Sequence, residues 1–222
     1  MKKTTQMNRL ILAITAVFAF AGCSTQIHYA VRNGNTERVK ELLDSGSDVN
    51  ATESSRAAEV FYGGKRLEYT PLHWAAFLGD LEMVQLLISK GAELNPIDPS
   101  WGTPLHLAAE QAQVEVVKFL LRKGARVNLT NPSWGHTPLH RAAWGPVIRR
   151  FGQEAQDLGA DPNPDYKKIV AILVAEGAEI NARDHEGETP LDQAIEGGSD
   201  ETVTLLKRYG GKTSKELKVD GK

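Results

Sequence analysis

Four histidines recur at one position of an internal repeat, and imidazole is a common metal ligand in proteins. They are His28, His73, His106 and His140. The other two, His136 and His185, lie at different positions of the repeat and complete no ligand set with cysteine or carboxylates. We therefore expect no metal site and no cofactor, and a metal or small-molecule carrier is only the third of three functional hypotheses.

No motif in the chain predicts catalysis. There is no Gly-x-Ser-x-Gly turn, no phosphate-binding loop and no paired His-Glu zinc signature. The many carboxylates fall on helix faces beside Lys or Arg, as is typical of ordinary protein surface. We predict that the protein is not an enzyme.

The N-terminal residues 1–22 have the pattern of a secretory signal. Lys2, Lys3 and Arg9 form a basic start, and the apolar run from Leu10 to Phe20 is too short to span a bilayer. The run leads into Ala21-Gly22-Cys23, which resembles the lipobox of bacterial lipoproteins, with Phe20 where Leu is usual. This resemblance implies cleavage before Cys23, attachment of lipid to Cys23, and no free thiol in the mature chain.

The lipoprotein resemblance also predicts where the protein lies. Ser24 follows the lipid-bearing cysteine, and because it is not Asp, the resemblance implies sorting to the outer membrane of a Gram-negative bacterium, facing the periplasm. Removal of three positive charges with the signal turns the net charge of −2 into about −5. No basic stripe remains, so nucleic acid is not an expected partner.

The segment Thr-Pro-Leu-His occurs at residues 70, 103 and 137, and a weakened form, Thr-Pro-Leu-Asp, begins at residue 189. Each unit contains two short helical patterns and closes on a phrase such as Gly91-Ala92-Glu93-Leu94-Asn95. The first two intervals, 33 and 34 residues, are close to the ankyrin period of a β-turn plus two helices. The chain resembles the ankyrin-repeat family, which implies an all-α repeat solenoid with hairpin-like fingers between the units.

The resemblance also implies that the recurring histidine fixes the turn through backbone hydrogen bonds. We expect a signal at 1–22, an ankyrin domain at 23–212 and a charged tail at 213–222. The expected units are 25–51, 70–95, 103–128, 137–181 with an insertion at 146–164, and 189–211.

Two stretches break the period. About a dozen extra residues precede Thr70, and a Gly63-Gly64 pair flanked by apolar and aromatic residues predicts an elongated hairpin finger there. The second stretch, 146–164, predicts either an additional helix inserted into the fourth unit or a degenerate sixth unit. Insertions in repeat proteins often lie on the face that binds.

Two tryptophans suggest binding. Trp101 and Trp134 stand in identical Pro-Ser-Trp-Gly segments on neighbouring fingers. A turn does not need an indole for its backbone geometry, and an exposed tryptophan is a typical binding hot spot. The equally favoured alternative is that each ring packs on the next finger and only stabilises the stack.

The positions after the Ala-Ala pair of each first helix face the concave groove in ankyrin proteins, so the resemblance places Phe77, Leu78 and Trp144 there. Together with Trp101, Trp134 and either Tyr62 or Tyr69, they predict an aromatic partner-binding patch. We expect Glu110, Arg141 and Asp98 at its rim. The alternative is that Phe77 and Trp144 pack under the long finger and the insertion.

These observations favour a lipid-anchored module that binds another protein. Its size and anchor suggest an immunity protein that inhibits a secreted antibacterial effector, such as a phospholipase of type VI secretion, by covering its active site. The alternative is a periplasmic scaffold or stress protein that supports a resident envelope enzyme.

Overall fold

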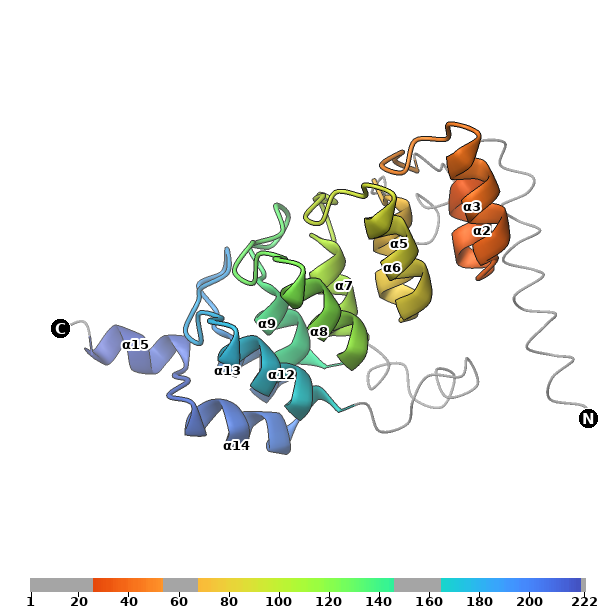
Figure 1. Cartoon of the computed structure of the whole chain (residues 1–222). Coiled ribbons are helices and arrows are strands. Elements are labelled where there is room, and N and C mark those ends of the chain that lie inside the picture. Colours follow the sequence, from red (N-terminus) through yellow and green to blue (C-terminus); the bar gives the residue numbers. More distant parts are fainter. Residues whose placement is uncertain (1–25, 54–67, 146–164, 221–222) are drawn as a thin grey trace, which may run out of the picture.

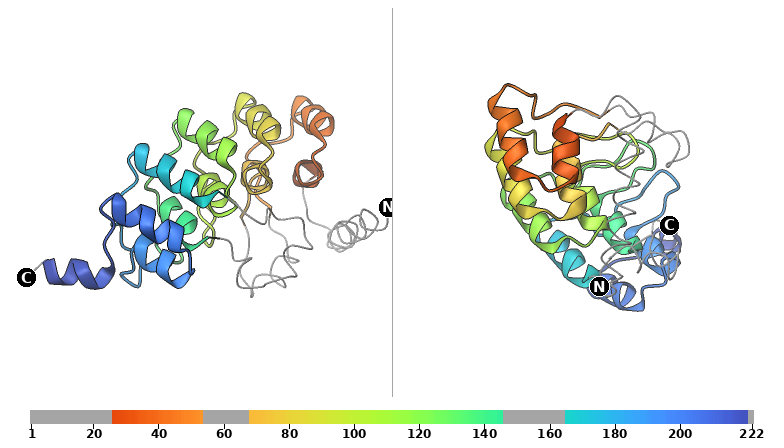
Figure 2. Two further views of the ribbon diagram at one scale, coloured as in Figure 1. Left: turned by 90° about the horizontal axis from the view of Figure 1, so that it is seen from below. Right: turned by 90° about the vertical axis from the view of Figure 1, so that its right-hand side faces the viewer.

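The computed structural model describes residues 26–53, 68–145 and 165–220, and these residues form eleven helices and no strand. Ten of the helices make five antiparallel pairs, stacked in chain order (Figures 1 and 2). The pairs are α2 (Gln26–Arg32) with α3 (Thr36–Asp44), α5 (Pro71–Leu78) with α6 (Leu81–Ser89), α7 (Pro104–Glu110) with α8 (Val114–Arg122), α9 (Pro138–Trp144) with α12 (Tyr166–Ala175), and α13 (Pro190–Glu196) with α14 (Asp200–Arg208). The expected all-α repeat solenoid is confirmed.

The stack has two rows of helices. The first helices α2, α5, α7, α9 and α13 pack on one another in that order, and α8, α12 and α14 do the same in the second row. Helix α15 (Ser214–Asp220) follows the last pair, at the end of the stack opposite α2 (Figure 1). The expected long finger and the sequence of the insertion lie outside the described residues.

Each Thr-Pro-Leu-His segment starts a first helix. Thr is the N-cap and Pro occupies the first turn, where its missing N–H costs no hydrogen bond. The His Nδ1 accepts a hydrogen bond from the N–H of the Thr three residues earlier, at 3.0 Å from Thr70 to His73 and 3.0 Å from Thr103 to His106. The helix start and the orientation of the imidazole ring are therefore set by the same four residues.

The other ring nitrogen of each histidine joins two units. Because Nδ1 is an acceptor, Nε2 carries the proton and donates to a backbone carbonyl of the next unit. The four bonds are His28 to Tyr69, His73 to Gly102, His106 to His136 and His140 to Glu188, at 2.9, 3.0, 3.0 and 3.2 Å. The expected structural role of these histidines is confirmed.

The second helices of the repeats are each followed by a glycine and share the same pattern of hydrogen bonds there. A leucine four residues before the terminal glycine is buried, as in Leu87, Leu120 and Leu173. Its carbonyl accepts the N–H of the residue after the glycine, which requires the left-handed backbone seen at Gly91, with φ of 90°. The closing Asn then accepts an N–H from the next unit, for example Asn95 from Arg126 at 2.9 Å.

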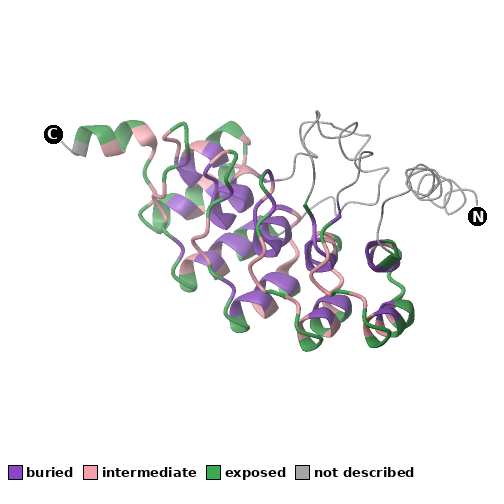
Figure 3. Ribbon diagram, turned by 90° about the horizontal axis from the view of Figure 1, so that it is seen from above, coloured by how far each residue is buried: buried purple, intermediate pink, exposed green. Residues whose placement is uncertain are grey.

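The core is continuous along the stack. One cluster of buried apolar residues extends from Ile27 in α2 to Leu206 in α14. Figure 3 shows burial on the facing sides of the helices and exposure at the turns. In the last unit, Asp192 replaces the histidine and its Oδ2 accepts the N–H of Ser214 at 2.7 Å, so α15 is tied to the end of the stack.

The buried histidines predict a loss of stability in acid. Burial lowers the pKa of His73 to about 4 and that of His106 to about 3. The unfolded chain, with a pKa near 6.5, therefore takes up protons that the folded chain does not. The free energy of unfolding is expected to be greatest above pH 6.5 and to fall as the pH decreases toward 4, by about 2 kcal/mol for each of these histidines at pH 5.

Urea unfolding followed by circular dichroism at pH 7.5, 6 and 5 measures this. His106→Gln should show a weaker pH dependence, whereas His185→Gln, which removes an exposed histidine, should keep the full dependence. Equal stability at pH 7.5 and pH 5 would contradict the conclusion that burial lowers the pKa values of His73 and His106.

Candidate functional site

The fingers between units are organised by one acidic or amide side chain each. Asp98 Oδ1 accepts the N–H groups of Ser100 and Trp101, at 2.9 and 2.7 Å. Asp184 Oδ1 accepts those of Glu186 and Glu188 in the last finger, at 3.0 and 2.8 Å. Since Asp98 is fully buried by these bonds and by one from the Glu68 N–H, it does not lie at the rim of a surface patch, contrary to expectation.

Neighbouring fingers are tied to one another. Asn131 Nδ2 donates to the Ser100 carbonyl at 2.7 Å, and the Ser133 N–H donates to the Pro99 carbonyl at 3.0 Å. The His185 N–H donates to the Trp134 carbonyl at 2.9 Å. The fingers that carry the tryptophans therefore form one continuous structure.

Trp101 and Trp134 each pack on the neighbouring finger and also keep part of the ring exposed, so both interpretations of these residues hold in part. Their rings meet edge to face at 6.2 Å, so each does pack on the neighbouring finger. Both remain only partly buried, and both line a cavity of about 450 Å³ together with Trp144. The cavity lies between these two fingers, the finger at 184–188, and the helices α9 and α13.

Arg141 lies beneath the two finger tryptophans. Its guanidinium carbon is 5.1 Å from the ring centre of Trp101 and 5.1 Å from that of Trp134. Its Nη1 is 3.8 Å from Glu110 Oε2, and Nη2 donates to the Ser100 carbonyl at 3.4 Å. Arg141 and Glu110 are 2% and 3% exposed, so the expectation that they form a polar rim is wrong. They are buried because they pair with each other under the indoles.

This buried pair is incompletely hydrogen-bonded. Arg141 Nε and Glu110 Oε2 are buried without a hydrogen-bond partner among the described residues. Burial raises the pKa of the Glu110 carboxyl, and the charge of Arg141 opposes that rise. A buried polar atom without a partner costs about 1–3 kcal/mol, so the pair lowers the stability of this part of the stack.

The same residue types form a completed cluster near the N-terminal end. Arg32 Nη1 donates to both oxygens of Glu53 at 3.0 Å, and Trp74 Nε1 donates to Glu53 Oε2 at 2.9 Å. The Arg32 guanidinium also lies over the Trp74 ring, at 5.0 Å. These bonds fasten the first unit to the second and hold Glu53 opposite Tyr69 in an isolated antiparallel bridge.

The aromatic residues of the second unit are more buried than expected. Tyr69 is 4% exposed and belongs to the core, so it is not part of an open patch. Phe77 is partly buried against Trp74, while Leu78 is 45% exposed. Phe77 and Trp101 pack against the same buried pair, Tyr69 and Leu107, so aromatic contacts extend from this unit to the cavity. Tyr62 and Cys23 lie outside the described residues.

Four acidic residues also line the cavity, and of these only Glu196 is at a position that the ankyrin resemblance places in the groove. They are Asp184, Glu186 and Glu188, together with Glu196 in the register of Trp144. Burial, followed by the charges of Asp184, Glu196 and Glu186, raises the pKa of Glu188. The signal that could have found Glu188 is its position directly before Thr189, which matches that of His136 before Thr137.

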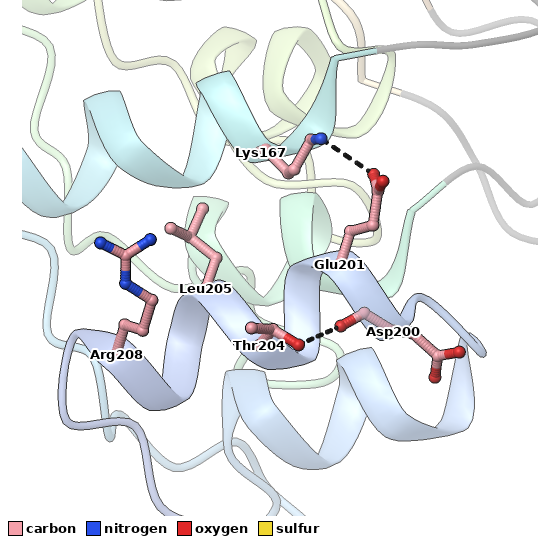
Figure 4. Close-up of a pocket in the computed structure, with 6 residues that line it drawn as sticks. All are labelled: Lys167, Asp200, Glu201, Thr204, Leu205 and Arg208. Carbon is pink, nitrogen blue, oxygen red and sulfur yellow. Dashed lines mark hydrogen bonds and ion pairs between the residues drawn. The ribbon is translucent and has the colours of Figure 1, made fainter.

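A second hollow of about 340 Å³ lies between α12 and α14 (Figure 4). Lys167 and Glu201 form an ion pair across it at 3.0 Å, and Thr204 bonds to the Asp200 carbonyl of its own helix. It lies between two packed helices and is lined by no aromatic residue, so it is a weaker candidate for binding a protein than the cavity at Trp144.

Comparison with known families agrees with this geometry. A family described as ankyrin repeats (3 copies) matches residues 16–98 and 95–163. The chain belongs to the ankyrin-repeat family. Ankyrin repeats are generally binding modules rather than enzymes, and no catalytic family is indicated, so the chain carries a protein-interaction module.

Three curated relatives illustrate the similarity. A putative ankyrin repeat protein of fowlpox virus is 34% identical over 76 residues, which are 34% of this chain and 16% of the relative. A Xenopus tropicalis myotrophin is 38% identical over 64 residues, 29% of this chain and 44% of the relative. A Caenorhabditis elegans homologue of transient receptor potential cation channel subfamily A member 1 is 31% identical over 173 residues, 78% of this chain and 9% of the relative. The chain thus spans less than half the length of each.

Two features are absent from the described residues, 26–53, 68–145 and 165–220. None of the helices in this part of the chain is long and apolar enough to cross a membrane. Within the same residues, no three side chains of His, Cys, Asp or Glu come together as a group that could hold a metal ion.

The Arg141–Glu110 pair predicts that removing one partner destabilises the protein more than removing both. Arg141→Met should destabilise the ankyrin domain by about 3 kcal/mol, because it leaves the Glu110 carboxylate buried without a counter-charge. The double variant Arg141→Met/Glu110→Leu should recover most of this loss, since no buried charge remains. Urea unfolding at pH 7.5 measures both, and equal destabilisation by the single and the double variant would contradict the pairing.

Proposed function

We propose that this protein is a lipid-anchored periplasmic binding module that acts as an immunity protein, inhibiting a secreted antibacterial effector by covering its active site. A phospholipase delivered by type VI secretion is the effector class that we favour. The observation that supports the proposal is the cavity lined by three partly exposed tryptophans on a stack of tied repeats.

The geometry suits inhibition by a preformed surface. The fingers and first helices are joined by hydrogen bonds from unit to unit, so little conformational entropy is lost when a partner binds. Trp144 and the exposed Leu78 offer apolar area on the first helices, where partly buried aromatic residues are typical binding hot spots. The negative net charge favours a partner with a basic binding surface.

The anchor is proposed from the sequence of residues 20–24. Several acyl chains on Cys23 would hold the protein on the membrane, because each buried methylene contributes about 0.8 kcal/mol. Such an anchor would keep the inhibitor at the compartment that a secreted phospholipase attacks.

The anchor predicts a simple fractionation result. In a Gram-negative host, the wild-type chain should incorporate radiolabelled palmitate and sediment with the outer membrane. Cys23→Ala should incorporate no label, because it removes the acylated thiol. Membrane association with label in Cys23→Ala would contradict the lipid anchor, while label with inner-membrane sedimentation of the wild type would contradict only the sorting inferred from Ser24.

The immunity role predicts neutralisation of an effector encoded beside this gene. The soluble chain from Ser24 onward should bind the effector and abolish its lipase activity at equimolar concentration. Leu78→Ala/Trp144→Ala should weaken binding at least 100-fold, because loss of each hot-spot side chain costs about 2 kcal/mol or more. Isothermal titration calorimetry and a phospholipid hydrolysis assay measure the two effects.

Tyr209→Ala/Val219→Ala is the matched control, since it removes exposed apolar side chains distant from the cavity. Equal weakening by both double variants would move the binding surface elsewhere. Binding of a resident envelope enzyme without inhibition, together with no effect on any effector, would instead support the scaffold hypothesis.

A further inference from the structure

We propose that the cavity at Trp144 binds a lysine or arginine side chain of the partner protein, with arginine bound more tightly. This inference deepens the proposed function and rests on it in taking the partner to be a protein. The binding site is the cavity defined above, between the fingers that carry Trp101 and Trp134, the finger at 184–188, and the helices α9 and α13.

The charge of the cavity favours a cation. Four carboxylates line it, on Asp184, Glu186, Glu188 and Glu196. Among the described residues that line it, the one Lys or Arg is Arg141, and its charge is opposed by the buried Glu110 at 3.8 Å. The cavity therefore carries an excess of negative charge.

Two of these carboxylates have no hydrogen-bond or ion-pair partner among the described residues. Asp184 is engaged by the finger N–H groups and lies 3.3 Å from His136 Nε2, and Glu188 accepts a hydrogen bond from Gln193 at 2.7 Å. By contrast, Glu186 and Glu196 are exposed and make no ion pair with any described residue. They are free to pair with a basic side chain of a partner.

A buried acceptor at the same place also lacks a donor. His136 lines the cavity, is 9% exposed and stacks between Trp134 and His140. When its Nε2 donates to Asp184, its Nδ1 is a lone pair, and this atom has no hydrogen-bond partner among the described residues. The acceptors that a partner can reach are the exposed carboxylates of Glu186 and Glu196. An ammonium or guanidinium group brings only donors, so it complements them.

The walls of the cavity suit a guanidinium in particular. The indoles of Trp101 and Trp134 already hold one guanidinium, that of Arg141, at 5.1 Å from each ring. Trp144 adds a third, partly exposed indole on the same cavity, and cations bind favourably over indole faces. A planar guanidinium can stack on an indole and also donate two hydrogen bonds to one carboxylate, which an ammonium cannot do. A volume of about 450 Å³ is enough for one long side chain with its neighbours.

The N-terminal cluster of the same residue types serves as an internal comparison. There, both oxygens of Glu53 accept hydrogen bonds from Arg32, and Trp74 donates to the same carboxylate. The arginine, glutamate and tryptophan of that cluster complete one another within the chain. The cavity at Trp144 instead has two exposed carboxylates, those of Glu186 and Glu196, without a partner among the described residues, which is the pattern of a site that a partner completes.

The test uses capped tripeptides acetyl-Gly-X-Gly-amide, in which X is Arg, Lys, citrulline or Glu. Citrulline has nearly the shape of arginine but no charge. Indole signals of ¹⁵N-labelled protein, residues 24–222, are followed by NMR during titration to 50 mM peptide. We expect the Arg peptide to shift the Trp144 and Trp134 signals with a dissociation constant in the millimolar range, the Lys peptide to bind more weakly, and the citrulline peptide at least tenfold more weakly.

Glu186→Gln/Glu196→Gln should weaken binding of the Arg peptide at least tenfold without altering the fold, because both side chains are exposed. The matched control, Glu176→Gln/Glu179→Gln, makes the same change of charge outside the cavity and should leave binding unchanged. Equal weakening in both would assign the effect to overall charge and overturn the proposal. No shift with the Arg peptide at 50 mM, or equal binding of the citrulline or Glu peptide, would also overturn it.

Occupancy of the cavity by the chain itself is tested separately. Arg149 and Arg150 follow soon after Trp144 in the sequence, outside the described residues. Tenfold tighter binding of the Arg peptide by Arg149→Gln/Arg150→Gln would show that these side chains compete for the cavity, and would overturn its assignment to a partner. If the Arg peptide does not bind while effector binding still depends on Leu78 and Trp144, only this inference fails and the proposed function stands.

Discussion

The structure depends on a hydrogen bond from a neutral histidine of one unit to a backbone carbonyl of the next. The bond requires one tautomer, in which Nδ1 accepts from the helix-starting Thr and Nε2 donates across the interface, as His106 does to the His136 carbonyl. Each ring therefore fixes both the start of its helix and the position of the following finger. The last unit has Asp192 in this position, and an acceptor there ends the stack by binding the Ser214 N–H.

Because the repeats are joined into one stable stack, the fold can tolerate buried polar atoms without hydrogen-bond partners near the cavity at Trp144. The Arg32–Glu53–Trp74 cluster joins two units and is fully bonded, so it contributes to the fold. Around Arg141 the same residue types leave buried atoms without partners, at a cost that the continuous apolar core offsets. This contrast within one chain is the physical reason for placing the partner site at Trp144, and it gives a reason for the indoles at the tips of two adjacent fingers.

Much of the fold could be predicted from the sequence, because in a repeat protein local signals recur. Thr-Pro at the start of four of the five first helices, glycine after each second helix and the single histidine register indicate helices whose positions the structure bears out. The site was harder to predict. Asp98, Glu110 and Arg141 are polar residues at surface-like positions, but Asp98 is buried by hydrogen bonds from backbone N–H groups, and Glu110 and Arg141 are buried as an ion pair. Glu186 has no counterpart at a matching position of the other units, because the fingers vary in sequence, and only the fold brings it to the cavity that Trp144 lines.

The most direct test of the central claim, that this array binds a protein through the cavity, is hydrogen–deuterium exchange of the protein alone and in complex with its effector. We expect slower exchange on binding in residues 131–145 and 184–197, with unchanged exchange in the second helices α6, α8 and α14. Protection confined to those second helices would contradict it, because the partner would then bind the opposite side of the stack.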